Sequence, residues 1–120
     1  MSVRAVRGAT QVEADDRVEI LGAVDELVTA VLARNHIQPE ALISVVFTAT
    51  PDLRAEFPAY AARQAGIGDV PLLCATEIDV PGALPRTIRL LAHFETDRSR
   101  DDVRHVYLRG AASLRTDLPR

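Results

Sequence analysis

Two arginines lie inside stretches that read as β-strands, and their positions suggest recognition of an anion. Arg7 lies in the alternating segment 3–9, beside the small residues Gly8 and Ala9. Arg89 lies within segment 87–96, which is too apolar to be a free edge strand. A guanidinium on an apolar strand face must be paired or reach into a pocket. Arg7 could equally lie at a solvated rim, and the partner of Arg89 is either a protein carboxylate or a ligand.

A carboxylate and a thiol lie near the end of another short apolar segment. Glu77 directly follows the run 72–75, and the C-terminal end of a strand is a frequent ligand position in α/β sheets. A solvated acid at the strand end is the commoner interpretation of such a position. Cys74 is interpreted as a packed thiol rather than a nucleophile, because no histidine is near it in sequence. Strict alternation puts Cys74 and Glu77 on opposite faces, so a shared role needs the strand to end or bulge between them.

Other polar candidates have ordinary structural interpretations. Tyr107 fits a half-buried strand position, Arg63 a solvated helix surface, and His93 and His105 satisfied strand positions. The sequence holds no nucleophile–base pair, no metal-ligand motif and no glycine-rich phosphate loop. These patterns alone therefore describe a small α/β domain with strand arginines suited to a dianion.

The composition narrows the possible functions. All 14 cationic side chains are arginine, which excludes Schiff-base and P-loop lysine chemistry. Codon bias can explain that total, so each arginine must be argued by its position. A net charge of −3 gives no electrostatic footprint for nucleic acid or for an anionic membrane. The single cysteine excludes an internal disulfide, and the lack of a signal peptide or a spanning apolar run predicts a cytoplasmic protein.

The elements that must position these residues alternate along the chain. One domain is expected over residues 1–120. Asp15 and Asp16 begin a long helix that Asn35 and His36 end, and a second helix over 58–65 is stopped by Gly66 and Gly68. Strands are expected at 3–9, 43–48, 72–76, 87–96 and 105–109, with a capped turn at 99–102 and an irregular tail over 110–118. The order β-α-β-α-β-β predicts an α/β (α+β) fold, with a mixed sheet and helices on one face.

Six local strings, in this order and spacing, resemble a known family. They are Val6-Arg7-Gly8-Ala9-Thr10, Ala49-Thr50-Pro51-Asp52-Leu53, Phe57-Pro58-Ala59, Cys74 with Glu77 and Asp79, Arg89, and Arg104-His105-Val106-Tyr107-Leu108. The chain resembles the monofunctional chorismate mutases of the small trimeric α/β type from Val3 to about Leu118. The resemblance implies a homotrimeric pseudo-α/β-barrel with active sites between subunits and no metal or cofactor. It also implies the rearrangement of chorismate to prephenate, the branch step of the shikimate pathway toward phenylalanine and tyrosine.

The resemblance also assigns roles to individual residues. Arg89 matches the donor to the ether oxygen and side-chain carboxylate of the substrate. Arg7 matches the second carboxylate anchor, assisted by Tyr107, and Glu77 matches the acceptor for the ring hydroxyl, with Cys74 beside it. The remaining matches are wall positions, which are Phe57, Ala59, Leu73 and Leu114, and cleft-mouth positions, which are Arg63 and Arg115. Residues 57–63 would line the cleft from the neighbouring subunit.

The sequence departs from the family pattern at a few positions, and two other functions remain as alternatives. Tyr60 stands where a long charged side chain is expected, and Leu73 where a small polar residue could lie, so both affect the rim. The chain ends soon after Arg115, which puts closure of the cleft by the tail in doubt. The alternatives are an imine deaminase-like hydrolase on a similar trimeric scaffold and a non-catalytic module that binds a small dianion.

Overall fold

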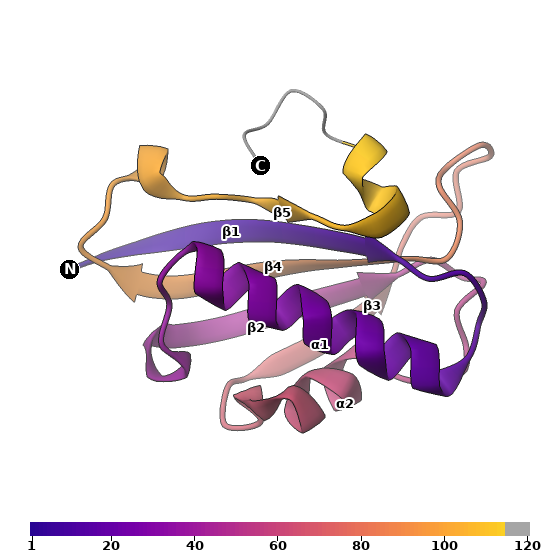
Figure 1. Cartoon of the computed structure of the whole chain (residues 1–120), viewed down its shortest axis with the longest axis horizontal. Helices are drawn as coiled ribbons and strands as arrows, with labels where there is room; N and C mark the ends of the chain where they lie inside the picture. The colour runs from indigo at the N-terminus through magenta and orange to yellow at the C-terminus, as the bar shows by residue number, and fades with distance from the viewer. Residues whose placement is uncertain (115–120) are drawn as a thin grey trace.

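Segments in which apolar and polar residues alternate form the strands of a sheet. The aliphatic segment between the first two strands forms the longest helix. The computed structural model describes residues 1–114, and Figure 1 shows their arrangement. The strands are β1 (Ser2–Gln11), β2 (Leu42–Ala49), β3 (Leu72–Thr76), β4 (Thr87–Thr96) and β5 (Val106–Tyr107). The helices are α1 (Arg17–Arg34) and α2 (Pro58–Ala62), and short 3₁₀ segments cover Pro39–Ala41, Arg100–Asp102 and Arg109–Ser113.

The five strands form one mixed sheet in the order β3-β2-β4-β1-β5. β4 lies at its centre and runs antiparallel to both β1 and β2, whereas β5 is parallel to β1 and β3 is parallel to β2. In this register Arg89 of β4 is opposite Ala9 on one side and Thr48 on the other. The predicted mixed sheet is confirmed, and its central strand carries the arginine.

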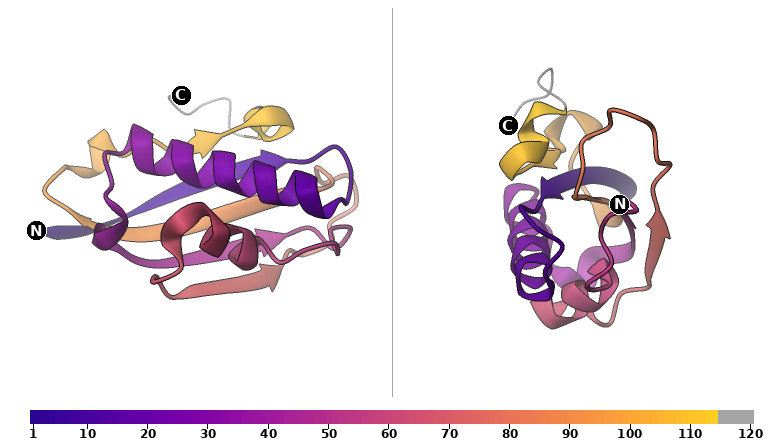
Figure 2. Two further views of the ribbon diagram at one scale, coloured as in Figure 1. Left: turned by 60° about the horizontal axis from the view of Figure 1, so that its bottom comes forward. Right: turned by 90° about the vertical axis from the view of Figure 1, so that its right-hand side faces the viewer.

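Both helices pack on the same face of the sheet, as predicted (Figure 2). The core between helices and sheet is aliphatic apart from Phe47 and Phe94, and both of these rings are fully buried. A Cβ atom at Gly8 would approach side-chain atoms of Leu27 and Val31 to 3.1 and 3.2 Å. Glycine at this position therefore lets α1 lie directly against β1.

The opposite face of the sheet carries side chains of a different kind, and no α-helix of residues 1–114 packs against it. Arg7, Arg89 and Thr48 lie on this open face because each has the opposite parity to the core residues of its strand. Three apolar side chains on it are also exposed, Leu73 at 63%, Val3 at 56% and Leu91 at 38%. The open face therefore combines exposed leucines with the arginines singled out by the sequence.

The ends of α1 match the sequence prediction. The Asp16 side chain accepts a hydrogen bond from the main-chain N–H of Glu19 at 3.0 Å, which caps the helix. After Asn35 the chain leaves the helix through His36, whose φ is +53°. The second helix differs from the prediction, because regular α-helix ends at Ala62 and a π-type turn covers Arg63–Ile67. Gly66 lies within this turn and breaks the helical backbone with a φ of +106°, a value that glycine adopts without strain.

The C-terminal part also differs from the sequence prediction. β5 is limited to Val106 and Tyr107, whereas a strand over 105–109 was expected. The segment expected to be irregular instead begins with a 3₁₀ helix over Arg109–Ser113 that buries Ala111 completely. The predicted turn at 99–102 is confirmed as a capping box between Ser99 and Asp102. No helix in the described part of the chain is long and apolar enough to cross a membrane.

A buried asparagine ties the end of α1 to the segment before β5. Asn35 is 3% exposed, and its side chain accepts from the main-chain N–H of Arg104 at 2.7 Å. Its amide nitrogen donates to the carbonyl oxygens of Arg104 and Val31, both at 2.9 Å. Asn35 therefore satisfies both main-chain polar groups of Arg104 and fixes where the chain enters β5.

Replacing Asn35 by alanine is expected to lower the free energy of unfolding by about 2–3 kcal/mol. The substitution removes three hydrogen bonds and leaves main-chain groups of Arg104 without their partner in a poorly solvated position. Denaturant unfolding followed by far-ultraviolet circular dichroism measures the change. Asn35→Asp is the comparison, because it keeps the acceptor for Arg104 but loses the donor. A loss below about 0.5 kcal/mol for Asn35→Ala, within the range of surface changes, would contradict this role.

Candidate active site

The open face of the sheet contains a cavity of about 450 Å³ between β1, β4 and β5. Its polar lining comes from Arg7, Thr48, Arg89 and Tyr107, and its apolar lining includes Leu91. The further lining residues are Gly8, Ala9, Val46, Leu90 and Leu114. Two strand arginines that are far apart in sequence therefore meet in one cavity, as their interpretation as anion-binding residues requires.

Arg89 is held at the cavity by an ion pair with Glu77. The Nε atom of Arg89 lies 3.2 and 3.1 Å from the two carboxylate oxygens of Glu77, and the hydroxyl of Thr48 donates to Glu77 Oε2 at 2.7 Å. The Glu77 side chain is 16% exposed and the Arg89 side chain 42%. The sequence left open whether Arg89 meets a protein carboxylate or a ligand, and without a ligand it meets Glu77.

The sheet register explains why these three side chains converge. Thr48 is the partner of Arg89 across β2 and β4, and of Ala75 across β2 and β3. Glu77 follows Ala75 by two residues, and its main-chain N–H donates to the carbonyl oxygen of Ala49 at 2.9 Å, which extends the ladder past the end of β3. Side chains two residues apart share a face, so Glu77 points to the side of Thr48 and Arg89.

The ion pair with Glu77 uses only the Nε atom of the Arg89 guanidinium. Among residues 1–114, Glu77 is its sole hydrogen-bond partner, and both contacts are made by Nε. The two terminal nitrogens therefore keep their N–H groups available for a second anion in the cavity. Arg89 can hold Glu77 and a ligand at the same time because its guanidinium has donors on several edges.

Arg7 and Tyr107 lie on the other side of the same cavity. Ala9 of β1 is opposite Tyr107 of β5, and Arg7 precedes Ala9 by two residues, so both side chains share the open face. Within the described residues, neither the Arg7 guanidinium nor the Tyr107 hydroxyl has a hydrogen-bond partner, although both line the cavity. These groups are therefore free to bind the second charge of a dianion.

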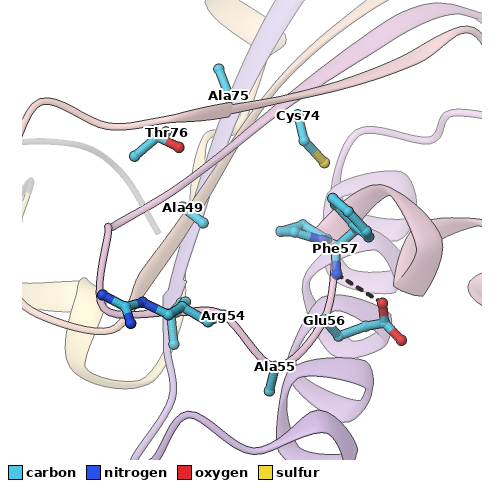
Figure 3. A pocket seen from close by; sticks show the side chains of 10 residues that line it. Ala49, Arg54, Ala55, Glu56, Phe57, Cys74, Ala75 and Thr76 are labelled. Carbon is cyan, nitrogen blue, oxygen red and sulfur yellow. Dashed lines mark hydrogen bonds between the residues drawn. The ribbon is translucent and has the colours of Figure 1, made fainter.

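Two further expected site residues, Phe57 and Cys74, line a second, separate pocket of about 300 Å³. Figure 3 shows the Phe57 ring and the Cys74 thiol together on one side of it, with Arg54 across from them. The Cys74 Sγ atom accepts a hydrogen bond from the main-chain N–H of Ala59 at 3.2 Å. Cys74 is thus a half-buried thiol that anchors the start of α2, which agrees with its interpretation as a packed residue.

The sequence-predicted residues therefore divide into two groups within one chain. Arg7, Arg89, Tyr107 and Leu114 line the first cavity, and Glu77 reaches it through Arg89. Phe57 and Cys74 line the second pocket, while the Leu73 side chain is exposed on the open face.

Three further expected residues lie outside both pockets or outside the described part of the chain. Ala59 contributes its main-chain N–H to Cys74 and lines neither pocket. Arg63 is exposed on the Tyr60 ring, 5.7 Å from its centroid, and lines neither pocket. Arg115 lies outside the described residues.

The sequence interpretation missed Thr48. It is the hydrogen-bond donor that, with Arg89, fixes the Glu77 carboxylate, and it lines the cavity itself. The sequence shows only that Thr48 alternates with the apolar residues of the run 43–48. Its proximity to Arg89 follows only once the register between β2 and β4 is known. Among the described residues, no three His, Cys, Asp or Glu side chains gather in a way that could hold a metal ion.

Comparisons with known proteins agree on one family. The family model described as chorismate mutase type I matches residues 3–118. Chorismate mutase AroH of Thermus thermophilus is 54% identical over 117 residues, which cover 97% of this chain and 96% of that protein. Chorismate mutase AroH of Bacillus subtilis is 43% identical over 119 residues, covering 98% and 94% of the two chains. A solved chorismate mutase from Clostridium thermocellum superposes with a TM-score of 0.89 at 42% identity and covers 92% of this chain and 98% of its own.

Proposed function

Because this chain belongs to the type I chorismate mutase family, we propose that the arginine-lined cavity is where it converts chorismate to prephenate. The observation that carries the proposal is the placement of Arg7 and Arg89, two guanidinium groups with unused donors, around one cavity of about 450 Å³. Chorismate carries two carboxylates, so a site with two separate arginines matches its charge. The reaction belongs to the biosynthesis of phenylalanine and tyrosine.

The chemistry needs neither a nucleophile nor a general base. The rearrangement breaks a C–O bond and forms a C–C bond in one pericyclic step, so the protein contributes by holding the compact reactive conformer. The two arginines act at the two ends of the substrate: Arg7, helped by the Tyr107 hydroxyl, binds one carboxylate, and Arg89 binds the other. Holding both ends restricts the substrate to the folded geometry in which the new bond can form.

Arg89 also stabilises the transition state. The ether oxygen gains negative charge as the C–O bond lengthens, and a fixed donor at that oxygen is stronger in the transition state than in the ground state. The terminal N–H groups of Arg89 supply this donor while Nε stays paired with Glu77. The Thr48–Glu77–Arg89 network thus fixes the guanidinium before the substrate arrives. Glu77 accepts from the ring hydroxyl and faces the ring as positive charge develops there.

The second pocket completes the site in an assembly of three chains. Phe57 and Cys74 line a pocket separate from the arginine cavity of the same chain, which supports a site built from two subunits. The open sheet face supports an assembly of this kind, since it exposes Leu73 and Leu91, and Phe57 is 70% exposed. A homotrimer with the cleft between adjacent subunits brings residues 57–63 of one chain toward Arg7 and Arg89 of its neighbour.

The homotrimer predicts a hydrodynamic mass three times that of the chain. Sedimentation equilibrium at micromolar concentration measures it directly. Leu73→Glu, which places a charge on the exposed apolar part of the open face, is expected to shift the protein toward the monomer and to reduce activity together. A stable, active wild-type monomer at micromolar concentration would contradict a site shared between subunits.

The mutase activity itself is tested by following the loss of chorismate absorbance in the ultraviolet. The purified chain is expected to accelerate this loss well above the thermal background without any added metal or cofactor. A rate equal to the background would overturn the proposed function. Family membership favours the mutase over the imine hydrolase, whose activity would appear as ammonia released from an imine substrate. It also favours the mutase over a binding module, which would bind prephenate without turnover. A cytoplasmic location stays a prediction of the sequence.

A further inference from the structure

We propose that the His105 side chain is a positioning residue that holds Arg7 at the substrate carboxylate. The inference rests on the proposed function, because it assigns to His105 the placement of one of the two anion-binding arginines. Its basis is a hydrogen bond from β1 to the residue directly before β5. The main-chain N–H of Arg7 donates to the imidazole Nδ1 atom of His105 at 2.9 Å.

This bond replaces a main-chain contact that the sheet lacks at this position. β5 pairs with β1 only through Gly8 with Val106 and Ala9 with Tyr107. Continuing this register by one residue would bring Arg7 opposite His105, where the carbonyl oxygen of Arg104 would be the regular acceptor. A side-chain nitrogen accepts the N–H of Arg7 instead, so the ladder continues through an imidazole.

The Asn35 side chain explains why the ladder stops there. Asn35 donates to the Arg104 carbonyl oxygen at 2.9 Å and accepts from the Arg104 main-chain N–H at 2.7 Å. Both main-chain polar groups of Arg104 therefore point toward the end of α1. The main chain before β5 thus turns away from β1, and among residues 1–114 His105 is the acceptor that the N–H of Arg7 retains. An N–H without a partner loses the constraint that fixes the strand backbone at that residue.

His105 connects Arg7 and Tyr107, the two residues proposed to bind the same substrate carboxylate. Tyr107 is paired with Ala9 across β5 and β1. His105 lies two residues before Tyr107, and its imidazole binds Arg7, which lies two residues before Ala9. Arg7 and Tyr107 are therefore fixed relative to each other through His105. Since Nδ1 accepts the Arg7 N–H, the neutral ring carries its proton on Nε2. A residue at 105 must present an acceptor at the Nδ1 position to keep this geometry.

The test uses two substitutions that separate the acceptor from the ring. His105→Phe keeps a flat ring and removes the acceptor, whereas His105→Asn removes the ring and keeps an oxygen near the position of Nδ1. His105→Phe is expected to raise the KM for chorismate by about 10-fold to 10²-fold with a smaller fall in kcat, because a misplaced anchor weakens the ground and transition states together. His105→Asn is expected to stay within about threefold of wild type in both constants. His36→Phe, at an exposed histidine that follows α1 and lines neither pocket, is the control and is expected to leave both constants unchanged.

A double-substitution cycle with Arg7 shows whether His105 acts through that residue. In an Arg7→Ala background His105→Phe is expected to have almost no further effect, since the side chain that it positions is absent. An equal effect of His105→Phe in both backgrounds would overturn the inference. So would a lower kcat at unchanged KM for both His105 variants, which indicates a smaller active fraction. A wild-type protein without mutase activity would overturn the proposed function itself, whereas an active wild type with a harmless His105→Phe would overturn this inference alone.

Discussion

An Arg89→Ala variant is expected to lose at least about 10²–10³-fold in kcat with chorismate, the size of effect that follows loss of one preorganised donor. The alanine removes the terminal N–H groups that are proposed to bind the ether oxygen, and it leaves the Glu77 carboxylate without its cation. Steady-state assays of chorismate loss measure the change. Arg34→Ala is the control, because this exposed arginine lies in the last turn of α1 and touches neither pocket.

Arg89→Lys is expected to fail almost as badly, and this variant tests the geometry rather than the charge. Arg89 uses Nε for Glu77 at 3.2 and 3.1 Å and keeps its terminal nitrogens for the substrate. Lysine has one nitrogen, so it can pair with Glu77 or reach the ether oxygen but cannot hold both positions in a fixed plane. A loss of less than about tenfold in kcat for Arg89→Lys would contradict the ether-oxygen role.

A Glu77→Ala variant is expected to lose about 10²-fold in kcat/KM. The carboxylate makes charge-assisted hydrogen bonds worth about 1.5–3 kcal/mol each, and two consequences add here. The substrate ring hydroxyl loses its acceptor, and Arg89 loses the anion that orients its guanidinium. Glu77→Gln keeps the shape without the charge, so its loss is expected to lie between those of wild type and alanine.

Thr48→Val is the graded control for this prediction. It removes one hydroxyl donor at 2.7 Å and leaves both the Glu77 carboxylate and its ion pair with Arg89 in place. The expected loss in kcat/KM is therefore about tenfold, the low end of the value of a hydrogen bond to a charged group and less than the loss for Glu77→Ala. Thermal unfolding of each variant separates loss of activity from loss of fold. The network is excluded as a catalytic device if Glu77→Ala retains wild-type kcat/KM, or if Thr48→Val is more harmful than Glu77→Ala.

Residue parity predicted much of the arginine cavity, because alternation depends only on neighbours in the sequence. Arg7 and Arg89 were placed inside strands, and the structure brings both to the open face. The relation between strands was not predictable in this way. Thr48 meets Glu77 only because β2 pairs with both β3 and β4, and this register is decided by packing across the whole sheet.

Cys74 and Glu77 show the same limit from the other side. Alternation correctly separated them, since Cys74 bonds to α2 while Glu77 bonds on the open face to Thr48 and Arg89. The contact between His105 and Arg7 could not be foreseen, because it depends on how Asn35 diverts the chain before β5. The 3₁₀ helix over Arg109–Ser113 was missed because short 3₁₀ turns carry no periodic apolar signal.

If the open sheet face is the interface of the proposed trimer, protein concentration becomes a determinant of stability. Exposed leucines on one side of a five-stranded sheet give residues 1–114 an apolar surface that a neighbouring chain of the proposed trimer would cover. Association of folded chains draws the equilibrium away from the unfolded state by mass action, so the thermal midpoint rises as the protein is concentrated. Dilution removes the same support. In the proposed trimer, dilution would therefore loosen the fold and dismantle the catalytic clefts as one event.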